Sequence, residues 1–327
     1  MTTTITSGGV DWAGRLRTGL VDRVERSFTG QREIVETAVI CLLAGGHLLV
    51  EGPPGSGKTT LARAVAAALA PAPGTDAWRR VQFTPDLLPA EITGYEQPLL
   101  TGGAAPFRPG PLFAHVVVAD EINRASPRTQ SALLEAMEER RVTVAGRTHR
   151  LPDPFFVVAT QNPVDLHGTY LLPEAELDRF TARVAVGYPS RAAETAIAAG
   201  RLTEPEGAGP PHLRAEDVLA AREATAAVAV TDALVGYAVA VAEATRTEDA
   251  LVGGVSVRAT RALVAAARAR AFLDGRGHAD AKDVQRVAVA VLAHRVVPSG
   301  RSGGDAAAVI GDLLTRVPAP ENAACAP

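Results

Sequence analysis

The stretch "HLLVEGPPGSGKTTLA", residues 47–62, runs from a short apolar segment through a glycine-rich loop into an alanine-rich segment. A continuous apolar run of this length is typical of a buried parallel strand, and the segment after the loop favours a helix. The loop between them satisfies the spacing G-x-x-x-x-G-K-[ST], which in this context marks a phosphate-binding loop. The candidate nucleotide-binding residues are Gly52, Pro54, Gly55, Ser56, Gly57, Lys58, Thr59 and Thr60.

Lys58 is one of only two lysines in a chain with 33 basic residues, which indicates a geometric requirement for lysine at this position. The ammonium group is a compact charge on a flexible stem and can reach between the β- and γ-phosphates of ATP, whereas the planar fork of arginine is bulkier. The loop amides and the helix N-terminus add positive potential. Thr59 would place its hydroxyl on Mg²⁺. The alternative is a glycine-rich turn that binds nothing.

Two adjacent carboxylates follow a second apolar run in "VVVADEINR", residues 116–124. The carboxyl ends of parallel strands meet at one edge of a sheet, where ligands bind in open α/β folds. We therefore expect Asp120 to lie beside the glycine-rich loop and to hold the Mg²⁺ of the nucleotide, through water, and Glu121 to polarise the attacking water. Without the loop nearby, an Asp-Glu pair after a strand would more often be a solvated acidic turn.

Apolar strand-like segments alternate with helical patterns up to residue 190, which predicts a parallel sheet covered on both faces, an αβα three-layer core. The character then changes to alanine-rich helical patterns without a convincing strand, which predicts a smaller all-α domain. The predicted divisions are a helical lead-in over 1–29, the α/β domain over 30–190, the helical domain over 191–317 and a disordered tail over 318–327. Within the α/β domain we expect a Pro/Gly-rich insertion at 84–111 and a β-hairpin at 141–152.

Composition narrows the class of protein. A formal net charge of −3 and a pI near 6.2 argue against a partner made of duplex nucleic acid, which needs a strongly basic face. Two cysteines far apart in sequence fit a reducing compartment. The N-terminal segment lacks the pattern of a signal peptide, and no apolar run reaches the ~18 residues of a spanning helix. We expect a cytoplasmic protein without membrane insertion.

The chain resembles the MoxR branch of the AAA+ ATPases, the helix-2-insert clade. Four stretches carry the resemblance: "GPPGSGKTT", "ADEINRASPRTQSALLEAMEERRVT", "ATQNPVDLHGTYLLPEAELDRF" and the insertion "QFTPDLLPAEITGYEQPLL…FRPGPLFAH". The glycine-rich loop is shared by many families, whereas the combination of the other motifs is specific. The resemblance covers most of residues 30–190 and continues through "GGVSVRATRALVAAARARA", residues 253–271, in the helical part, which it implies is a lid domain.

The resemblance implies further site residues. Asn162, in "TQNP", would be the sensor-1 residue that orients the lytic water or contacts the γ-phosphate; an Asn-Pro pair alone is more often a turn. Arg179 matches the arginine finger that reaches the nucleotide of a neighbouring subunit, against the alternative that it pairs with Asp178 or Glu174. Arg258 matches the sensor-2 arginine, acting in cis or in trans. The resemblance also suggests that Arg124 or Arg128 shares the role at the neighbouring subunit's site. Gly30-Gln31 stands where the family has a turn beside the adenine.

One departure from the family pattern concerns the lid. Where a "GASPRA"-like stretch is expected the chain has "GVSVRA", so Val257 stands in place of a proline and leaves the lid angle open. The implied function is an ATPase using ATP and Mg²⁺ in a homo-oligomeric ring, a hexamer, that remodels or activates a partner protein with a von Willebrand factor A domain. Alternatives are the motor subunit of a metal chelatase, a nucleic-acid motor and a nucleotide-gated scaffold.

Overall fold

The computed structural model describes residues 14, 16–28, 31–70, 74–97, 105–163, 168–200, 213–299 and 305–320. Several sequence expectations fall partly on positions outside these ranges: residues 1–13 of the helical lead-in, Gly30 of the adenine-side turn, residues 98–104 of the insertion and residues 321–327 of the predicted tail. The domain boundaries at residues 29, 190 and 317 stay predictions.

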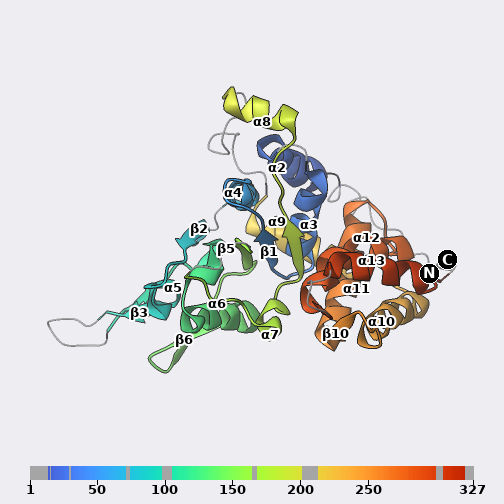
Figure 1. The fold of residues 1–327 in the computed structure, drawn as a ribbon. Coiled ribbons are helices and arrows are strands. Elements are labelled where there is room, and N and C mark those ends of the chain that lie inside the picture. The colour runs from blue at the N-terminus through green and yellow to red at the C-terminus, as the bar shows by residue number, and fades with distance from the viewer. Residues whose placement is uncertain are drawn as a thin grey trace.

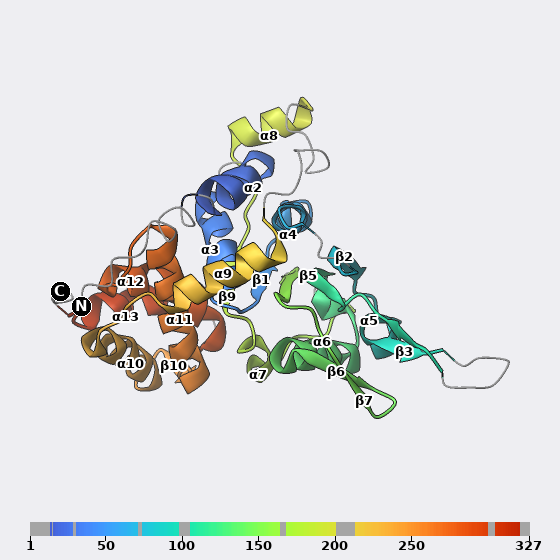
Figure 2. The same cartoon turned by 180° about the vertical axis from the view of Figure 1, so that it is seen from behind.

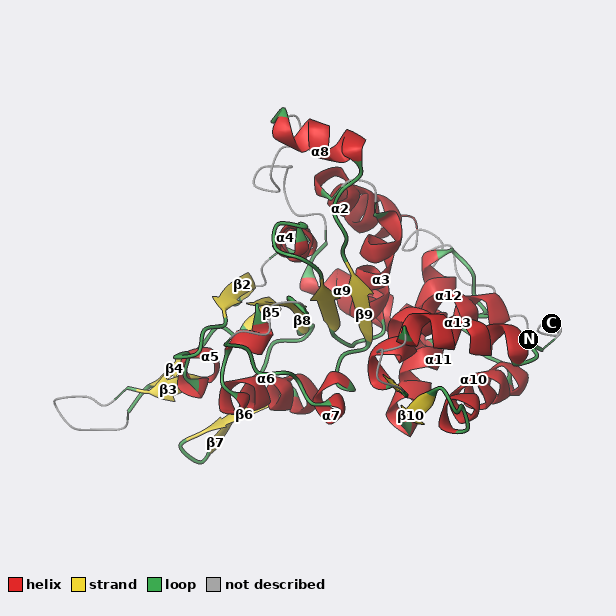
Figure 3. Cartoon of the chain, viewed as in Figure 1, coloured by secondary structure: helices red, strands yellow, loops and turns green. Residues whose placement is uncertain are grey.

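Five parallel strands form the central sheet, and they include the apolar run before the glycine-rich loop and the apolar run that ends in Asp120. Their order across the sheet is β2-β5-β8-β1-β9, so the strand before the glycine-rich loop is flanked by β8 and β9. Their bounds are β1 Leu48–Glu51, β2 Asp76–Gln82, β5 Ala114–Asp120, β8 Phe156–Gln161 and β9 Ala182–Ala185. The prediction of a parallel α/β sheet is confirmed (Figure 3).

Helices cover both faces of this sheet because its strands are apolar on both sides. Val116 and Val118 of β5 join one buried cluster with α3 (Arg32–Leu43) and α4 (Lys58–Ala67). Val117 and Ala119, which point the other way, join a second cluster with α6 (Pro127–Glu139). Alternate residues of a strand point to opposite faces, so these two clusters are the two faces of a three-layer αβα core.

The insertion and the hairpin lie together at the end of the molecule opposite the helical part (Figure 1). The insertion contains α5 (Pro89–Thr93) and the antiparallel pair β3 (Gly94–Glu96) and β4 (Phe107–Pro109). The predicted hairpin is confirmed as β6 (Arg141–Val144) paired with β7 (Arg147–Arg150). Phe107 of the insertion stacks on His149 of the hairpin at 3.8 Å between ring centroids, so the two features pack as one surface.

The chain after residue 190 is mainly helical. A short antiparallel ribbon, which sequence patterns did not predict, joins β10 (Leu251–Gly253) to β11 (Val297–Pro298). Figure 2 shows α9 (Ala215–Ala226) between the sheet and α11 (Val257–Leu273), and α9 packs on both α3 and α11. Within the described ranges, no helix combines the length and apolar surface needed to cross a membrane. The helices are α8 Arg191–Ala198, α9 Ala215–Ala226, α10 Asp232–Arg246, α11 Val257–Leu273, α12 Ala281–Leu292 and α13 Ala306–Arg316.

Short helical elements complete the chain. The predicted helical lead-in contains η1 (Arg17–Val21) and α2 (Asp22–Ser27), and α2 packs against α4, the helix that follows the glycine-rich loop. The others are η2 Ile122–Arg124, α7 Glu174–Leu177 and η3 Ala293–Arg295. The N-terminal segment therefore lies beside the loop that the sequence assigns to phosphate.

Candidate active site

The glycine-rich loop connects β1 to α4 and can be built only with glycine at two of its positions. A Cβ on Gly52 would lie 2.2 Å from the carbonyl oxygen of Val186, so any side chain there would clash with backbone. Gly57 has a φ of +91° and a Cβ on it would meet the ring of Phe28 at 3.1 Å. Between them Pro54 and Gly55 are exposed, which leaves the outer side of the loop open to a ligand.

The start of α4 presents hydrogen-bond donors toward the loop. The helix begins at Lys58, and the described residues supply no side-chain cap at Gly57, so the N–H groups of the first turn, Thr59 and Thr60 included, are the usual unsatisfied donors of a helix terminus. The buried hydroxyl of Ser56 likewise has no hydrogen-bond partner among the described residues. A glycine-rich loop with unpartnered donors at a helix N-terminus is suited to phosphate oxygens.

Lys58 lies over the same loop. Its ammonium donates to the carbonyl oxygens of Gly52 and Pro53, both at 2.7 Å, and two acceptors do not exhaust its three N–H groups. Burial lowers the pKa of Lys58, while the carboxylates of Asp120 and Glu121 act on that pKa in the opposite direction. The ammonium therefore lies within electrostatic range of both acids predicted for the site.

Asp120 is the buried centre of the polar cluster at the carboxyl edge of the sheet, with 7% of its side chain exposed. Thr59 donates to both of its carboxylate oxygens at 3.1 Å, and Thr160 of β8 donates to Oδ1 at 2.5 Å. Arg80 of β2 pairs with Oδ2 at 2.7 Å. The hydroxyl of Thr59 beside a carboxylate offers the hard oxygen ligands that Mg²⁺ prefers, so these residues fit the predicted metal.

Glu121 adopts left-handed backbone, with φ 55° and ψ 50°, which is unfavourable for a non-glycine residue by ~1 kcal/mol. Its N–H donates to Thr160 Oγ1 at 3.0 Å, which holds this conformation. The carboxylate accepts from Gln82 Nε2 at 3.1 Å and pairs with Arg124 at 2.9 Å. The turn thus directs Glu121 toward the end of β2 and away from the buried position of Asp120.

Asn162 follows directly on β8, at the same edge of the sheet. It is half-buried, and its backbone carbonyl accepts from the buried side chain of Asn123 at 3.3 Å. The sheet order places β8 between β5 and β1, so Asn162 lies between the strand that ends in Asp120 and the strand that enters the loop. The structure therefore brings the loop, Asp120, Glu121 and Asn162 to one edge, as the sequence predicted.

Arg179 and Arg258 lie together, but not at that edge. Both pair with Glu138 of α6: Arg179 Nε lies 3.3 Å from Oε2, and Arg258 donates to Oε1. The pairing of Arg179 with Asp178 or Glu174, considered from sequence, is not the contact found. Both arginines line a cavity of about 440 Å³ together with His47 and Arg261, and no residue of the glycine-rich loop lines it.

This cavity lies at the amino edge of the sheet. His47 precedes β1, and its carbonyl accepts from Thr181, which precedes β9, at 2.8 Å. A strand rises roughly 3.3 Å per residue, so His47 and Gly52 are roughly 16 Å apart along β1. Within one chain, Arg179 and Arg258 therefore lie at the opposite end of β1 from Lys58.

The remaining arginines considered from sequence lie on the surface. Arg124 pairs with Glu121 of the same chain, and Arg128 is exposed in the first turn of α6. Val257, the departure from the family pattern, is the first residue of α11, the position where proline is favoured, and Ser256 caps the helix by accepting from Ala259 N. With valine at this position, α11 therefore begins at the same residue at which a proline would have fixed its start.

Comparison with known proteins identifies the family. A model described as "ATPase family associated with various cellular activities (AAA)" matches residues 47–182, and an AAA lid domain matches residues 243–312. "Chaperone MoxR1" of Mycobacterium tuberculosis is 42% identical over 293 residues, which cover 84% of this chain and 74% of that protein. The chain belongs to the MoxR-type AAA+ ATPases.

Two further comparisons match along nearly the whole chain. "Uncharacterized protein YeaC" of Bacillus subtilis is 41% identical over 304 residues, covering 92% of this chain and 93% of that one. A crystal structure described as "a putative ATPase from Cytophaga hutchinsonii" superimposes with a TM-score of 0.84 at 30% identity, covering 96% of this chain and 97% of that chain. The MoxR-type protein described here is accordingly an ATP-hydrolysing enzyme with an AAA+ domain and a helical lid, as the motifs predicted.

Two contacts of this MoxR-type site were missed by sequence reasoning. Arg80 of β2 makes the first, because the two-residue period of a strand puts it on the same face as Gln82, next to the end of β5. Glu138 lies in a helix rich in acidic residues, and the sequence holds no signal that selects it to bind Arg179 and Arg258 together.

Proposed function

We propose that this chain hydrolyses ATP at sites shared between neighbouring subunits of a homo-oligomeric ring, a hexamer, and uses the resulting motion to remodel or activate a partner protein with a von Willebrand factor A domain. The observation that carries the proposal is the separation of the two half-sites: Lys58 lies at the carboxyl end of β1, and Arg179 with Arg258 lies beyond its amino end. Each half requires its counterpart from another chain.

In this proposal the glycine-rich loop binds the nucleotide. Its backbone N–H groups and the Lys58 ammonium hold the β- and γ-phosphates, and Lys58 exchanges its bonds to the carbonyls of Gly52 and Pro53 for phosphate oxygens. Thr59 would ligate Mg²⁺ directly and Asp120 through water. The metal neutralises charge that develops on the phosphate oxygens. Thr160 keeps the carboxylate of Asp120 fixed at the end of β5.

Glu121 is the proposed base that accepts a proton from the attacking water, and Asn162 orients that water. The rigid turn at Glu121 supports this role, since Thr160 fixes its backbone and Gln82 and Arg124 fix its carboxylate. The carboxylate remains 39% exposed, so water can reach it. Arg124 is assigned to the same chain's Glu121 and not to the neighbouring site.

Arg179 and Arg258 complete the site of the neighbouring subunit. They stabilise negative charge in the transition state, a contribution that is worth about 10³-fold or more for arginine fingers. Arg258 is assigned a role in trans, because it shares Glu138 with Arg179 and not a pocket with the loop of its own chain. Glu138 holds both guanidinium groups until the neighbour's phosphates replace it.

Loss of the γ-phosphate would remove an anchor shared by the loop of one subunit and the arginines of the next, so the two subunits can rotate relative to each other. We assign this motion to work on a partner protein in the cytoplasm. The name of the MoxR1 relative, a chaperone, supports a remodelling role. The von Willebrand factor A partner follows from the family resemblance of the motifs.

A complementation experiment tests the shared site. Lys58→Ala and Arg179→Ala should each be inactive alone, whereas a mixture should regain activity, because an intact loop then meets an intact finger at about a quarter of randomly formed interfaces. Differently tagged subunits, co-purified, establish that mixed rings form. Persistent inactivity of demonstrably mixed rings would remove the trans-acting finger.

A trapping experiment tests the partner. Glu121→Gln with ATP should hold the nucleotide-bound ring in native cell extract, and a protein with a von Willebrand factor A domain should co-purify with it and not with Lys58→Ala. Stimulation of ATP hydrolysis by that partner is the second readout. Recovery only of partners that lack such a domain would contradict this part of the proposal.

A further inference from the structure

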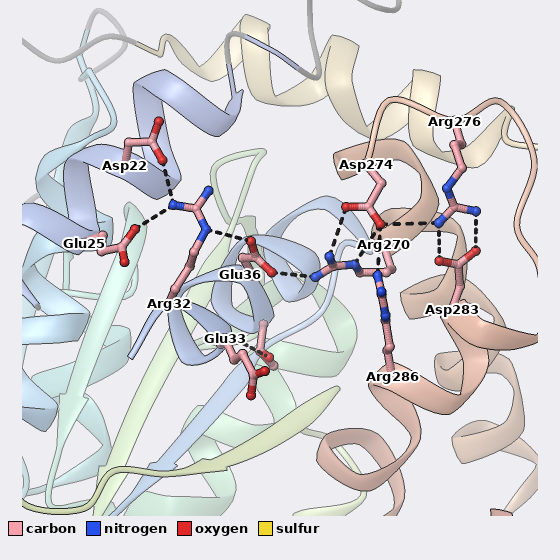
Figure 4. Close-up of polar contacts among 11 residues, drawn as sticks. Asp22, Glu25, Arg32, Glu33, Glu36, Arg270, Asp274, Arg276, Asp283 and Arg286 are labelled. Atoms are coloured by element: carbon pink, nitrogen blue, oxygen red, sulfur yellow. Dashed lines mark hydrogen bonds and ion pairs between the residues drawn. The ribbon is translucent and has the colours of Figure 1, made fainter. Parts of the chain in front are cut away.

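A chain of alternating charges ties the lid to the α/β domain. It runs from α2 through α3 to α11 and α12, and Figure 4 shows Glu36 at its centre with Arg32 and Arg270 approaching from opposite sides. We call this set the charge chain; its members are Asp22, Glu25, Arg32, Glu36, Arg270, Asp274, Arg276 and Asp283.

Glu36 is the link between the two domains. Its carboxylate accepts from Arg32 Nε at 3.1 Å and from Arg270 Nη1 at 2.5 Å. Only 10% of the Glu36 side chain and 15% of the Arg270 side chain are exposed. Exposed ion pairs contribute little, whereas a pair removed from water in this way is held in a defined geometry. Glu36 therefore fixes the end of α11 to α3.

The α2 end of the charge chain lies near the nucleotide loop, which Phe28 at the end of α2 approaches. Arg32 binds Asp22 at 2.9 Å and Glu25 at 2.6 Å, both on α2. This helix packs on α4, and the ring of Phe28 at its end lies against Gly57 of the loop. A change in the loop conformation on nucleotide binding would therefore displace Phe28 and α2. Arg32 would move with α2, because it is bound to Asp22 and Glu25.

The lid end of the charge chain leads to the arginine donated to the neighbour. Arg270 and Arg258 belong to one continuous helix, α11, in which they lie roughly 18 Å apart at 1.5 Å per residue. The far end of α11 is held by the contact of Arg258 with Glu138 and by Ser256, which donates to Asp178 at 3.0 Å. A displacement of Arg270 is thus passed along a rigid helix to Arg258.

We propose that Glu36 is a positioning residue for Arg258: through Arg270 it sets the place of α11, and through Arg32 it couples that place to the nucleotide loop of the same chain. The proposal rests on the proposed function, because it assumes that Arg258 serves the neighbouring site. Glu36 thereby acts on hydrolysis in the next subunit without a contact between Glu36 and any phosphate.

Mixed rings separate this role from a purely structural one. The acceptor subunit carries Arg179→Ala and Arg258→Ala and keeps an intact loop; the donor carries Lys58→Ala and keeps both arginines. All hydrolysis then occurs in the acceptor's loop. Glu36→Gln is placed in the donor or in the acceptor, and kcat and KM for ATP are measured. The substitution keeps the shape of Glu36, and Arg270 and Arg32 retain Asp274, Asp22 and Glu25 as partners.

The expected result is asymmetric. In the donor, Glu36→Gln should lower kcat about tenfold or more, the scale on which small misplacements of a catalytic group act, and leave KM unchanged. In the acceptor it should have no effect, because that subunit has no Arg258 to position. The matched control is Glu248→Gln in the donor, which removes a carboxylate paired with Arg316 inside the lid, away from the charge chain, and should leave kcat unchanged.

The remaining outcomes test the proposed function and the positioning role of Glu36 separately. No activity in mixed rings with wild-type Glu36 contradicts the proposed function, and the positioning role, which rests on it, is overturned with it. Equal losses in donor and acceptor, or a donor variant equal to the Glu248→Gln control, overturn the positioning role. Should Glu36→Gln not enter rings, Arg270→Lys in the donor, which keeps a cation but loses the fork, should give a smaller loss of kcat. Failure of both variants to enter rings assigns the charge chain to folding and overturns the proposal.

Discussion

Arg80 Nη2 lies 2.7 Å from Asp120 Oδ2, so the carboxylate proposed to serve the metal is already paired with a cation. The two residues come from neighbouring strands, β2 and β5, and meet at the carboxyl edge of the sheet. The guanidinium is 47% exposed whereas the carboxylate is buried, so the arginine can withdraw into solvent more easily than the aspartate can move. Arg80 and Mg²⁺ are therefore expected to compete for Asp120.

Replacement of Arg80 tests this competition. Arg80→Gln should lower the Mg²⁺ concentration needed for half-maximal ATP hydrolysis about three- to tenfold, the scale of a partly exposed ion pair, with little change in kcat. The control is Arg79→Gln on the same strand, whose guanidinium pairs with Asp76 instead. An unchanged Mg²⁺ requirement would show that Arg80 does not compete with the metal.

The two lysines of the chain provide a matched pair of substitutions. Lys58→Ala removes the ammonium at the loop and should weaken ATP binding about 100-fold, which corresponds to ~3 kcal/mol of charge-assisted contacts. Lys282→Ala removes the exposed lysine of α12 and should leave the Kd unchanged. Titration of a fluorescent ATP analogue measures both. Equal affinities of the two variants would refute the assignment of Lys58.

Glu121→Gln separates binding from hydrolysis. The amide keeps the shape of the side chain but cannot accept the proton of water, so turnover should fall about 10²- to 10⁴-fold while ATP affinity is kept. Glu135→Gln, on the exposed side of α6, is the control and should hydrolyse ATP normally. Single-turnover measurements with saturating ATP distinguish the two effects. Turnover at the parental rate would exclude Glu121 as the base.

Buried histidines predict a loss of stability in acid. Burial, and secondarily the charge of Arg140, lowers the pKa of His47 to about 3. Its Nδ1 accepts from Val157 N at 3.0 Å, a bond that only the neutral ring can accept. The unfolded state takes up the proton near pH 6.5, so stability due to neutral His47 is present above that pH and falls as the pH drops toward 3, by about 2 kcal/mol at pH 5.

Urea unfolding at pH 7.5 and pH 5.0 measures this loss. His47→Gln should reduce the difference between the two pH values by about 2 kcal/mol, even if the variant is less stable at both. His278→Gln, at an exposed position, serves as the control. His294, whose pKa burial also lowers, contributes in the same direction. An unchanged pH dependence in His47→Gln would mean that His47 does not titrate on unfolding.

The elements predicted well are those whose signal is local. The loop around Lys58, the strand into it and the strand ending at Asp120 each follow from contiguous residues, and the common edge follows from parallel order. The contacts predicted poorly join residues far apart in the chain. Arg80 meets Asp120 across two strands, and Glu138 gathers two arginines from α11 and from the segment after α7, so no local pattern selects them.

The lid shows the same distinction. Its helices follow from alanine-rich periodic patterns, but the β10–β11 ribbon pairs segments of three and two residues, too short for a periodic signal. Sequence also left the role of Arg258 open between cis and trans. That question depends on the direction in which α11 crosses the α/β domain, which is decided by packing and by contacts such as Glu36 with Arg270.

Strand β1 has a further consequence, because the loop and the paired arginines occupy its two ends. A contact that joins the loop of one protomer to the paired arginines of the next uses two different surfaces. Such a contact is heterologous, so it repeats head to tail. Left open, such an array is a filament with one unmatched loop and one idle arginine pair at its termini. Only a closed arrangement gives every protomer a completed pocket and also a neighbouring pocket that its own guanidinium groups can enter.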